Sequence, residues 1–379
     1  MTNAQMIRTE NNTKNDRMYI ALELSNKTWK IFFSNGFKKR KKTIDAGKLY
    51  QLEHEIAKTR KHFGMSEDVK INSCYEAGRD GFWIHRYLES RGIHNIVVDS
   101  ASIEVNRRSR RAKTDRIDAD KLLNMLMRYI GGERKLWSVL HVPSSNEEDA
   151  RRINREIKRL KKERTAHTNR IKSLLILHGI RLVINRKFLI NLEQVRLWNG
   201  EKLPRRVKAE IVRDYQRYEL IKVQLLELEL DKNALLKSEN TQARKVVALK
   251  RLKGIGTISS WDLVYEFFGW RRFNNVKQVG GAAGLAPTPY ASGSSDHEQG
   301  ISKAGNRRVR SLMIELAWYW LRFQPQSKLS CWFQERFGSG GKRMRKIGIV
   351  ALARKLLVSL WKYLDKGVLP EGAQMKAVI

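Results

Sequence analysis

The sequence predicts an α/β domain near the start of the chain, followed by long helices and a mainly helical C-terminal region. From Met18 to Ile130, short β-type runs alternate with amphipathic stretches, which is typical of an α/β domain. From Ile153 onward, apolar residues recur in steps of four and three, and beyond Ala248 glycine-rich turns separate short helices. A chain of 379 residues has room for two or three domains.

Within the α/β domain, β-type runs predict strands over residues 19–24, 29–33, 37–43, 69–75 and 95–99. Helical spacing over residues 48–63 predicts a first helix, which Gly64 would end. A glycine turn leads into a short second helix through Ile84 and Leu88, and a third helix runs from Asp115 to about Tyr129.

Two long apolar series predict the central helices. The first seam consists of Ile153, Ile157, Leu160, Arg164, His167, Ile171 and Leu174, of which Arg164 and His167 are polar interruptions. The second consists of Tyr218, Ile221, Leu225, Leu228 and Leu235. This spacing is typical of a coiled coil, and either an antiparallel hairpin or a coiled coil between subunits would fit. Asn199-Gly200 and Pro204 mark a break between them. We interpret His167 as a residue that sets register or solubility.

The C-terminal region mixes glycine-rich turns with apolar helices. Leu252 to Gly256 is similar to the hairpin of a helix-hairpin-helix module, whose glycines let backbone amides approach a phosphate. The segment from Gly280 to Gly305 is rich in small residues, and a helix begins at Arg307. We expect a loop over residues 324–345, a last helix over 347–364 and a C-terminal tail over 367–379. At the other end of the chain, residues 1–17 are expected to form a flexible tail.

The composition indicates a polyanionic partner. The 75 Lys and Arg outnumber the 39 Asp and Glu, which gives a formal net charge of +36 and a pI of about 10.3. Hydrophobic residues still make up 41% of the chain and include ten tryptophans, so the chain can bury cores and is not a disordered basic tail. We therefore expect nucleic acid as the partner, although charge does not distinguish DNA from RNA.

The sequence also indicates a cytoplasmic protein. Cys74 and Cys331 stand too far apart to suggest a zinc module or a disulfide scaffold, which fits a reducing compartment. The first seventeen residues lack the apolar stretch of a signal peptide. The late apolar stretch over 347–364 contains Arg354, Lys355 and Lys362, which argues against a membrane span.

An acidic pair stands inside a strongly basic run that opens at Arg107. Asp115 and Asp118 lie three residues apart, close enough on one helix face to share a divalent metal ion. Lys113 and Arg116 are their basic neighbours and candidates for nucleic-acid binding. Without a metal, the same residues would form an ordinary helix start, with Thr114 as the cap.

Four carboxylates together favour a metal site. Glu23 lies late in the first predicted strand, Glu76 ends the fourth, and Asp115 and Asp118 open the last helix of the domain. This order is that of a ribonuclease-H-like arrangement, in which these positions meet at one site. Two Mg²⁺ ions about 3.5 to 4 Å apart would there hold the attacking and leaving oxygens of a phosphodiester. Taken singly, Glu23 and Glu76 are ordinary acids at strand ends.

Several motifs resemble those of insertion-sequence 110 family transposases. In the first domain they are Tyr19 to Ser25, Tyr75 to Gly78 and Lys113 to Ala119. In the second domain they are Leu252 to Ser259, Gly284 to Pro287, Tyr290 to Gly293 and Gly300 to Arg308. The resemblance covers about residues 18 to 365, and the order and spacing of the motifs make it specific.

The resemblance implies an RNA-guided DNA recombinase. It implies a RuvC-like domain with a DEDD acid set, a coiled-coil linker and a mainly helical transposase domain with a serine nucleophile. Carried over by position, Glu76, Asp115 and Asp118 bind Mg²⁺ beside Glu23, and Ser292 attacks the DNA phosphate. The family uses a bridge RNA that pairs with donor and target DNA, and it assembles as a tetramer. The implied setting is the nucleoid of a bacterial or archaeal cytoplasm.

Two positions leave alternatives open. The family's first acid is usually aspartate, whereas this chain has Glu23, whose extra methylene shifts the carboxylate. Serine beside glycine is also common in turns, and Ser294 and Ser295 are alternative nucleophiles. Arg307, Arg308 and Arg310 would either stabilise the reacting phosphate or hold backbone phosphates.

The rival functions are a RuvC-like junction resolvase or nuclease that uses the acids alone, and a basic RNA-binding protein with a decayed site.

Overall fold

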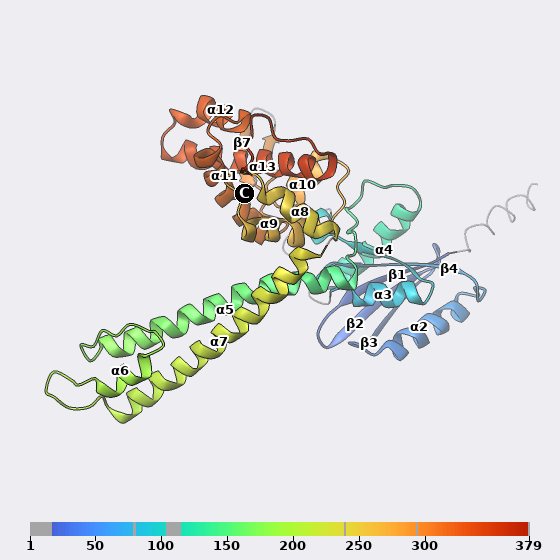
Figure 1. The fold of residues 1–379 in the computed structure, drawn as a ribbon. Coiled ribbons are helices and arrows are strands. Elements are labelled where there is room, and N and C mark those ends of the chain that lie inside the picture. Colours follow the sequence, from blue (N-terminus) through green and yellow to red (C-terminus); the bar gives the residue numbers. More distant parts are fainter. Residues whose placement is uncertain (1–16, 79–80, 104–114, 239, 293–294, 378–379) are drawn as a thin grey trace, which may run out of the picture. The chain divides into compact units, whose positions relative to one another are not determined.

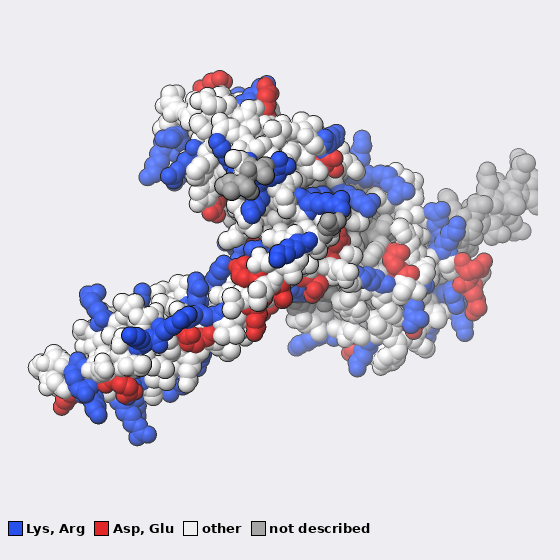
Figure 2. Space-filling model, viewed as in Figure 1, with Lys and Arg blue, Asp and Glu red and all other residues white. Residues whose placement is uncertain are grey.

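The computed structural model describes residues 17–78, 81–103, 115–238, 240–292 and 295–377 (Figure 1). The chain divides into two compact units, residues 1–143 and 144–379. The predicted flexible tail, residues 1–17, lies outside the described residues except for Arg17, which begins the first strand. Lys and Arg side chains are spread over the visible face of both units (Figure 2).

The first unit contains a mixed sheet. Its strands in the described residues are β1 (Arg17–Leu24), β2 (Thr28–Ser34), β3 (Lys39–Asp45), β4 (Lys70–Glu76) and β5 (His94–Val98). They lie in the order β3-β2-β1-β4-β5. β1 pairs antiparallel with β2 and parallel with β4, β2 pairs antiparallel with β3, and β4 pairs parallel with β5. β1 is therefore the central strand, with β4 beside it.

Helices cover both faces of this sheet. On one face Ile20 and Leu22 pack in a core with Leu52 of α2 (Leu49–His62) and Leu88 of α3 (Trp83–Ser90). On the other face, residues of alternate strand positions pack under α4 (Asp115–Ile130); they are Ala21, Phe32, Cys74 and Ile96, which meet Leu122 and Leu126. The period-two pattern of β1 thus produces two separate cores.

The third strand begins two residues later than the predicted range of 37–43. The backbone amides of Phe37 and Lys38 donate to Asn35 Oδ1 at 3.0 and 2.7 Å, and Gly36 has a φ of 93°. This turn places Phe37 outside the sheet, where it is exposed. An Asn-Gly turn is a strong hairpin signal, and here it outweighed the β propensity of phenylalanine.

The second unit begins with two long paired helices, α5 (Ser145–Ile176) and α7 (Arg205–Lys237), linked through α6 (Phe188–Gln194). Ser144 and Glu147 form a capping box at the start of α5. Leu160 packs with Leu225, and Ile171 packs with Ile211, so the helices run antiparallel within one chain. The seam residue His167 bonds through Nδ1 to Oδ1 of buried Asp214, at 2.9 Å.

The rest of this unit is mainly helical. Its described elements are α8 (Thr241–Lys250), α9 (Thr257–Leu263), the π-helical η4 (Val264–Phe268), α10 (Val276–Ala282), β6 (Pro287–Ser292), β7 (Ser295–Ile301), α11 (Arg307–Phe323), α12 (Lys328–Phe333), the π-helical η5 (Gln334–Gly338) and α13 (Lys342–Lys366). α11 packs on α13, and their core includes Trp261, Phe267, Trp320 and Leu352.

Residues 324–345 are not the predicted loop. They contain α12, η5 and the start of α13. Ser327 accepts a hydrogen bond from Trp320 Nε1 at 2.8 Å and also caps α12. Phe333 and Phe337, one helical turn apart, are buried. Polar and charged residues surround this short apolar repeat in the sequence, so its helical period was hard to recognise.

The last described residues pack on the second unit. The backbone amide of Lys253 donates to the carbonyl oxygen of Gln374. Gln324 Nε2 donates to the carbonyl oxygens of Lys253 and Gln374, each at 2.9 Å. The segment predicted as a C-terminal tail is described up to residue 377, and it packs against the turn between α8 and α9. Within the described residues, none of the helices is long and apolar enough to cross a membrane.

Candidate active site

The strand register places Glu23 and Glu76 beside each other. In the parallel β1–β4 pair, Ala21 lies opposite Cys74 and Leu22 lies opposite Tyr75. Glu23 and Glu76 are the next residues along these strands. Because strand residues alternate between faces, both share the face of Ala21 and Cys74, which is the face that α4 covers.

The surroundings of the two carboxylates differ. Glu23 is partly buried, and its Oε2 lies 3.8 Å from Nζ of Lys30, its cross-strand partner on β2. Glu76 is exposed at the end of β4. Carboxylate oxygens are the ligands that Mg²⁺ prefers, so this pair of carboxylates fits the Mg²⁺ that the sequence predicts.

Asp115 and Asp118 begin the helix that packs on this same face. α4 contacts β1, β2 and β4 through residues such as Leu122 and Leu126. The side chains of Asp115, Arg116 and Asp118, and the whole of Lys113, lie outside the described residues. In the described part of the chain, no group of three or more His, Cys, Asp or Glu could hold a metal ion. The four-acid site therefore stays a prediction.

Ser292 lies at the tip of a β-hairpin. It ends β6 and pairs in register with Ser295 of β7, so the small-residue segment that the sequence left unassigned contains two strands. Ser294 lies outside the described residues, and of Ser292 only the backbone is described. The hairpin's base is held by backbone bonds from Ser302 N to the Ala286 carbonyl at 2.9 Å and from Asn306 N to the Ala282 carbonyl at 2.8 Å.

Two glycines allow the chain to cross itself at this base. Gly284 and Gly305 have positive φ angles of 68° and 116°. A Cβ on Gly284 would lie 2.4 Å from the Ala304 carbonyl oxygen, and one on Gly305 would lie 2.5 Å from the Ala282 carbonyl oxygen. No other residue fits either position without moving the backbone.

We expect Gly305→Ala to destabilise the second unit by at least about 2 kcal/mol, because left-handed strain and a backbone clash add together. Gly300→Ala is the matched control, since Gly300 has a φ of 82° in the same hairpin but nothing within 4 Å of the added Cβ. It should cost about 1 kcal/mol. Urea unfolding measures both, and equal losses would show that the close crossing adds nothing.

The three candidate arginines at the start of α11 have different surroundings. Arg310 Nη1 donates to the carbonyl oxygens of Lys303 at 2.8 Å and Ala283 at 3.4 Å, so it holds the base of the hairpin. Arg308 Nη1 lies 3.3 Å from Oε1 of Glu266. Arg307 is exposed. A phosphate contact by any of them stays a prediction, and Arg307 is the most accessible.

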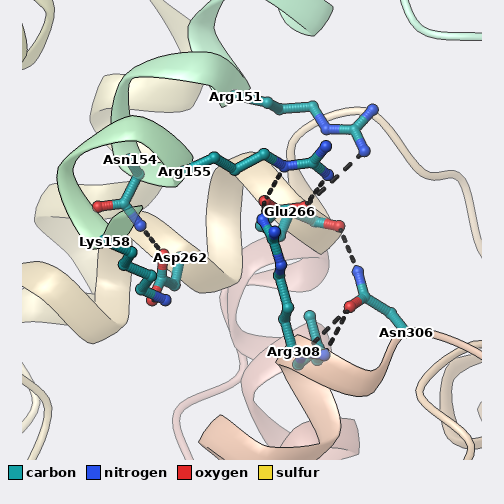
Figure 3. A network of polar contacts seen from close by, with 9 residues as sticks. Arg151, Asn154, Arg155, Lys158, Asp262, Glu266, Asn306 and Arg308 are labelled. Atoms are coloured by element: carbon teal, nitrogen blue, oxygen red, sulfur yellow. Dashed lines mark hydrogen bonds and ion pairs between the residues drawn. The ribbon is translucent and has the colours of Figure 1, made fainter. Parts of the chain in front are cut away.

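Glu266 on η4 joins three elements of the second unit (Figure 3). Arg155 of α5 binds both carboxylate oxygens, with Nε at 2.6 Å from Oε1 and Nη2 at 2.7 Å from Oε2. Arg151 approaches at 3.8 Å, and Arg308 binds from α11. Asn306 caps α11 and donates through Nδ2 to the Glu266 carbonyl at 3.3 Å. One buried carboxylate thus connects the long helices to the helix that follows the serine hairpin.

A second buried acid lies one turn earlier, at Asp262 on α9. Asn154 and Lys158 of α5 both bind its carboxylate. Burial raises the pKa of Asp262 in spite of the Lys158 ammonium group. Burial also opposes the charge of Glu266, but the hydrogen bond from Arg155 and the nearby guanidinium groups outweigh it and lower the pKa of Glu266.

We expect Glu266→Gln to destabilise the second unit by about 3 kcal/mol at pH 7, because it removes the buried charge that binds Arg155 and Arg308 and that compensates the largely buried Arg151. Since the pKa of Glu266 is lowered on folding, its contribution is present above the ordinary value of 4.5 and is lost as the pH falls through the folded pKa. The raised pKa of Asp262 contributes with the opposite sign, and Glu266→Gln reduces this contribution because the Glu266 charge is one of the causes that raise it.

Urea unfolding at pH values from 7 down to 3, with hydrogen exchange of peptides from α5 and α11, measures this effect. Glu163→Gln is the matched control, because Glu163 also contacts an arginine on α5 but is exposed. It should change stability by less than about 0.5 kcal/mol. A constant difference between parent and Glu266→Gln over this whole pH range would contradict the assignment.

The sequence reading missed this network. Asp262 and Glu266 stand four residues apart inside an otherwise apolar run from Trp261 to Trp270. Charged residues in such a run are seldom buried unless they are paired, and Arg151, Arg155 and Lys158 recur at matching helical intervals. That combination was the available signal.

Comparisons with known proteins agree with the motifs. Residues 247–330 match a family model described as Transposase IS116/IS110/IS902 family. The protein y4rJ of Sinorhizobium fredii, which carries the name of a transposase, is 42% identical over 377 residues, covering 95% of this chain and 94% of the relative. The transposase for insertion sequence element IS1328 of Yersinia enterocolitica is 28% identical over 55% of this chain and 60% of its own length. The transposase for IS1111A of Coxiella burnetii is 24% identical over 67% of each.

Proposed function

The chain belongs to the IS116/IS110/IS902 family of transposases, and we propose that it is an RNA-guided DNA transposase that cleaves and rejoins strands through a serine nucleophile. Its proposed metal ligands are Glu23, Glu76, Asp115 and Asp118, and its proposed nucleophile is Ser292. The proposed substrates are donor and target DNA, and the proposed guide is a bridge RNA.

One observation supports the acid set most directly: Glu23 and Glu76 lie side by side on the face that α4 covers. The sheet order β3-β2-β1-β4-β5, with β2 alone antiparallel to its two neighbours, fits the ribonuclease-H-like and RuvC-like assignment. In this arrangement the ends of the two central strands and the start of the last helix belong to one site. The same positions carry the four predicted acids.

Bound Mg²⁺ would polarise the DNA phosphate and stabilise the oxygens that attack and leave. The Ser292 hydroxyl would lose its proton as its oxygen bonds to phosphorus, while the bond from phosphorus to one DNA oxygen breaks and that oxygen takes up a proton, which gives a covalent serine–DNA link. The crossing at Gly284 and Gly305, with Arg310, fixes the base of the hairpin that carries this serine. Arg307, exposed at the start of α11, would contact a DNA phosphate in this proposal.

Ser292 and the acids belong to different units of the chain. We therefore extend the proposal to a homo-oligomer, with four subunits as in the resembled family. In it the serine of one subunit would complete a site with the acids of another. Mixing a Ser292→Ala chain with a Glu76→Gln chain would in this arrangement give more activity than either variant alone.

The guided function is tested by sequencing the RNA that copurifies with the protein expressed from its element with flanking non-coding sequence. We expect one discrete structured RNA, and recombination of DNA matching it in Mg²⁺ but not in EDTA. The net charge of +36 makes some RNA capture inevitable. Bulk degraded RNA alone, with no change in recombination after its removal, would contradict the guided function.

A further inference from the structure

An exposed tryptophan stands at the far end of the paired helices. This end, the arm tip, comprises residues 177–204 between α5 and α7. Trp198 is 94% exposed, the largest exposed fraction among the exposed hydrophobic residues of the described chain. Its neighbours in the sequence behave differently, since Leu203 is buried and Leu197 packs against the same core as Phe188. The ring is therefore held outside a formed core.

A tight turn fixes the backbone that carries this ring. Gly200 N donates to the Leu197 carbonyl at 2.9 Å, and Leu197 N donates to the Glu201 carbonyl at 2.8 Å. Glu201 N also bonds to Asn199 Oδ1 at 3.1 Å, and Gly200 has a φ of 84°. Arg196 and Lys202 form the bridge that closes the turn. An aromatic ring displayed on a closed turn loses little conformational entropy when it binds a partner.

The arm tip and the adjoining ends of α5 and α7 together form a basic region. Residues 170–208 contain ten Lys and Arg but only two Asp and Glu. The basic residues are Arg170, Lys172, Arg181, Arg186, Lys187, Arg196, Lys202, Arg205, Arg206 and Lys208. Lys208 pairs with Glu193, and Arg170 pairs with Glu210. Glu193 and Glu201, the two acids within this range, are too few to offset its positive charge. Lys and Arg side chains are visible around this end of the helices (Figure 2).

A groove of about 790 Å³ opens at the same end of the helices. Lys172 and Arg181 line it together with apolar side chains and Tyr218. A groove with cations and an aromatic ring is suited to a ligand that alternates charged and flat apolar groups. Nucleic acid with unpaired bases has this composition, because its phosphates are anionic and its bases have exposed faces.

We propose that the arm tip binds unpaired nucleotides of RNA or DNA, with a base stacked on Trp198 and the backbone held by the surrounding Lys and Arg. Bases within a duplex are already stacked on each other, so a fixed external ring favours single strands and loops. Lys202 is exposed beside the bridge that closes the turn and would contact a phosphate next to the stacked base, whereas Arg196 Nη1 donates to the carbonyl oxygens of Glu193 at 3.1 Å and Val195 at 2.9 Å. The proposal requires neither Ser292 nor the acids, and it can therefore fail or succeed independently of the proposed chemistry.

Fluorescence anisotropy in EDTA tests the proposal with the full-length protein. The probes are labelled oligouridine and oligothymidine of about 12 nucleotides, a DNA duplex and anionic lipid vesicles. We expect Trp198→Ala to weaken single-strand binding about 5- to 100-fold, with duplex binding unchanged within about twofold. Trp198→Phe should retain most of the affinity. Leu226→Ala, which removes another exposed apolar side chain, from α7, should change nothing.

A base analogue distinguishes stacking from a structural effect. The fluorescence of 2-aminopurine in the oligonucleotide should be quenched by the parent and by Trp198→Phe but not by Trp198→Ala. Comparison of oligouridine with oligothymidine shows whether RNA or DNA is the preferred source of unpaired bases. Equal loss of single-strand and duplex binding, unchanged quenching with Trp198→Ala, or loss of vesicle binding alone would each overturn the proposal.

Discussion

Replacing Ser292 by alanine is expected to abolish the covalent protein–DNA product and to reduce recombination by at least about 10⁴-fold, because no other group would supply the attacking oxygen. The hairpin should remain folded, since its base is held by backbone bonds and by Arg310 rather than by this side chain. Denaturing gels of reactions with radiolabelled DNA measure the product directly.

Two neighbouring serines provide the controls for this experiment. Ser295 pairs with Ser292 across the hairpin, and Ser294 follows it in the sequence. Ser295→Ala and Ser294→Ala should each retain the covalent product. If one of these variants lost the product while Ser292→Ala stayed active, the serine replaced in that variant would be the nucleophile. Normal strand cleavage by all three variants would instead favour a junction resolvase or nuclease that uses the acids alone.

Substitution of the acids is expected to have the second largest effect. Glu76→Gln should reduce strand cleavage about 10²- to 10³-fold, because an amide binds Mg²⁺ far more weakly than a carboxylate and leaves developing charge less stabilised. Asp115→Ala should be at least as severe. The activity lost by Glu76→Gln should respond to the metal, so the Mg²⁺ concentration for half-maximal cleavage should rise.

Asp120→Asn is the matched control on the same helix. Asp120 lies five residues after Asp115, but its Oδ1 bonds to Lys39 Nζ at 2.9 Å, away from the two strand acids. This variant should keep activity within about twofold. Glu23→Asp tests the position where the chain departs from its family: cleavage equal to or above that of the parent supports a metal ligand here. An inactive parent with an active Glu23→Asp variant would support a decayed site.

The sequence predicted the sheet and the long helices because local patterns determine them. Runs such as Tyr19 to Leu24 alternate between two buried faces, and the seams through Leu160 and Leu225 repeat at helical spacing. The hairpin at Ser292 was not predicted as strands, since its proline, glycine and serine content is typical of loops. What fixes it is a crossing between Gly284 and Gly305, twenty-one residues apart, which no local pattern reveals.

The candidate site shows the same limit. Glu23 and Glu76 could be assigned to neighbouring strand ends because the order of strands and helices follows from the pattern. Glu266 could not be assigned, because its role depends on Arg155, more than a hundred residues earlier in the chain. Trp198 was covered only as part of a break between helices, since a sequence does not show whether a tryptophan beside Asn-Gly is buried or displayed.

The ion pairs of Glu266 have a mechanical consequence for the second unit. Because Arg155 and Arg308 hold the same carboxylate, the start of α5 and the start of α11 cannot separate without breaking a buried charge pair. A pull or twist on the paired helices would therefore reach the base of the serine hairpin through a stiff connection. A partner bound at the arm tip would in this way transmit force to the segment that carries Ser292.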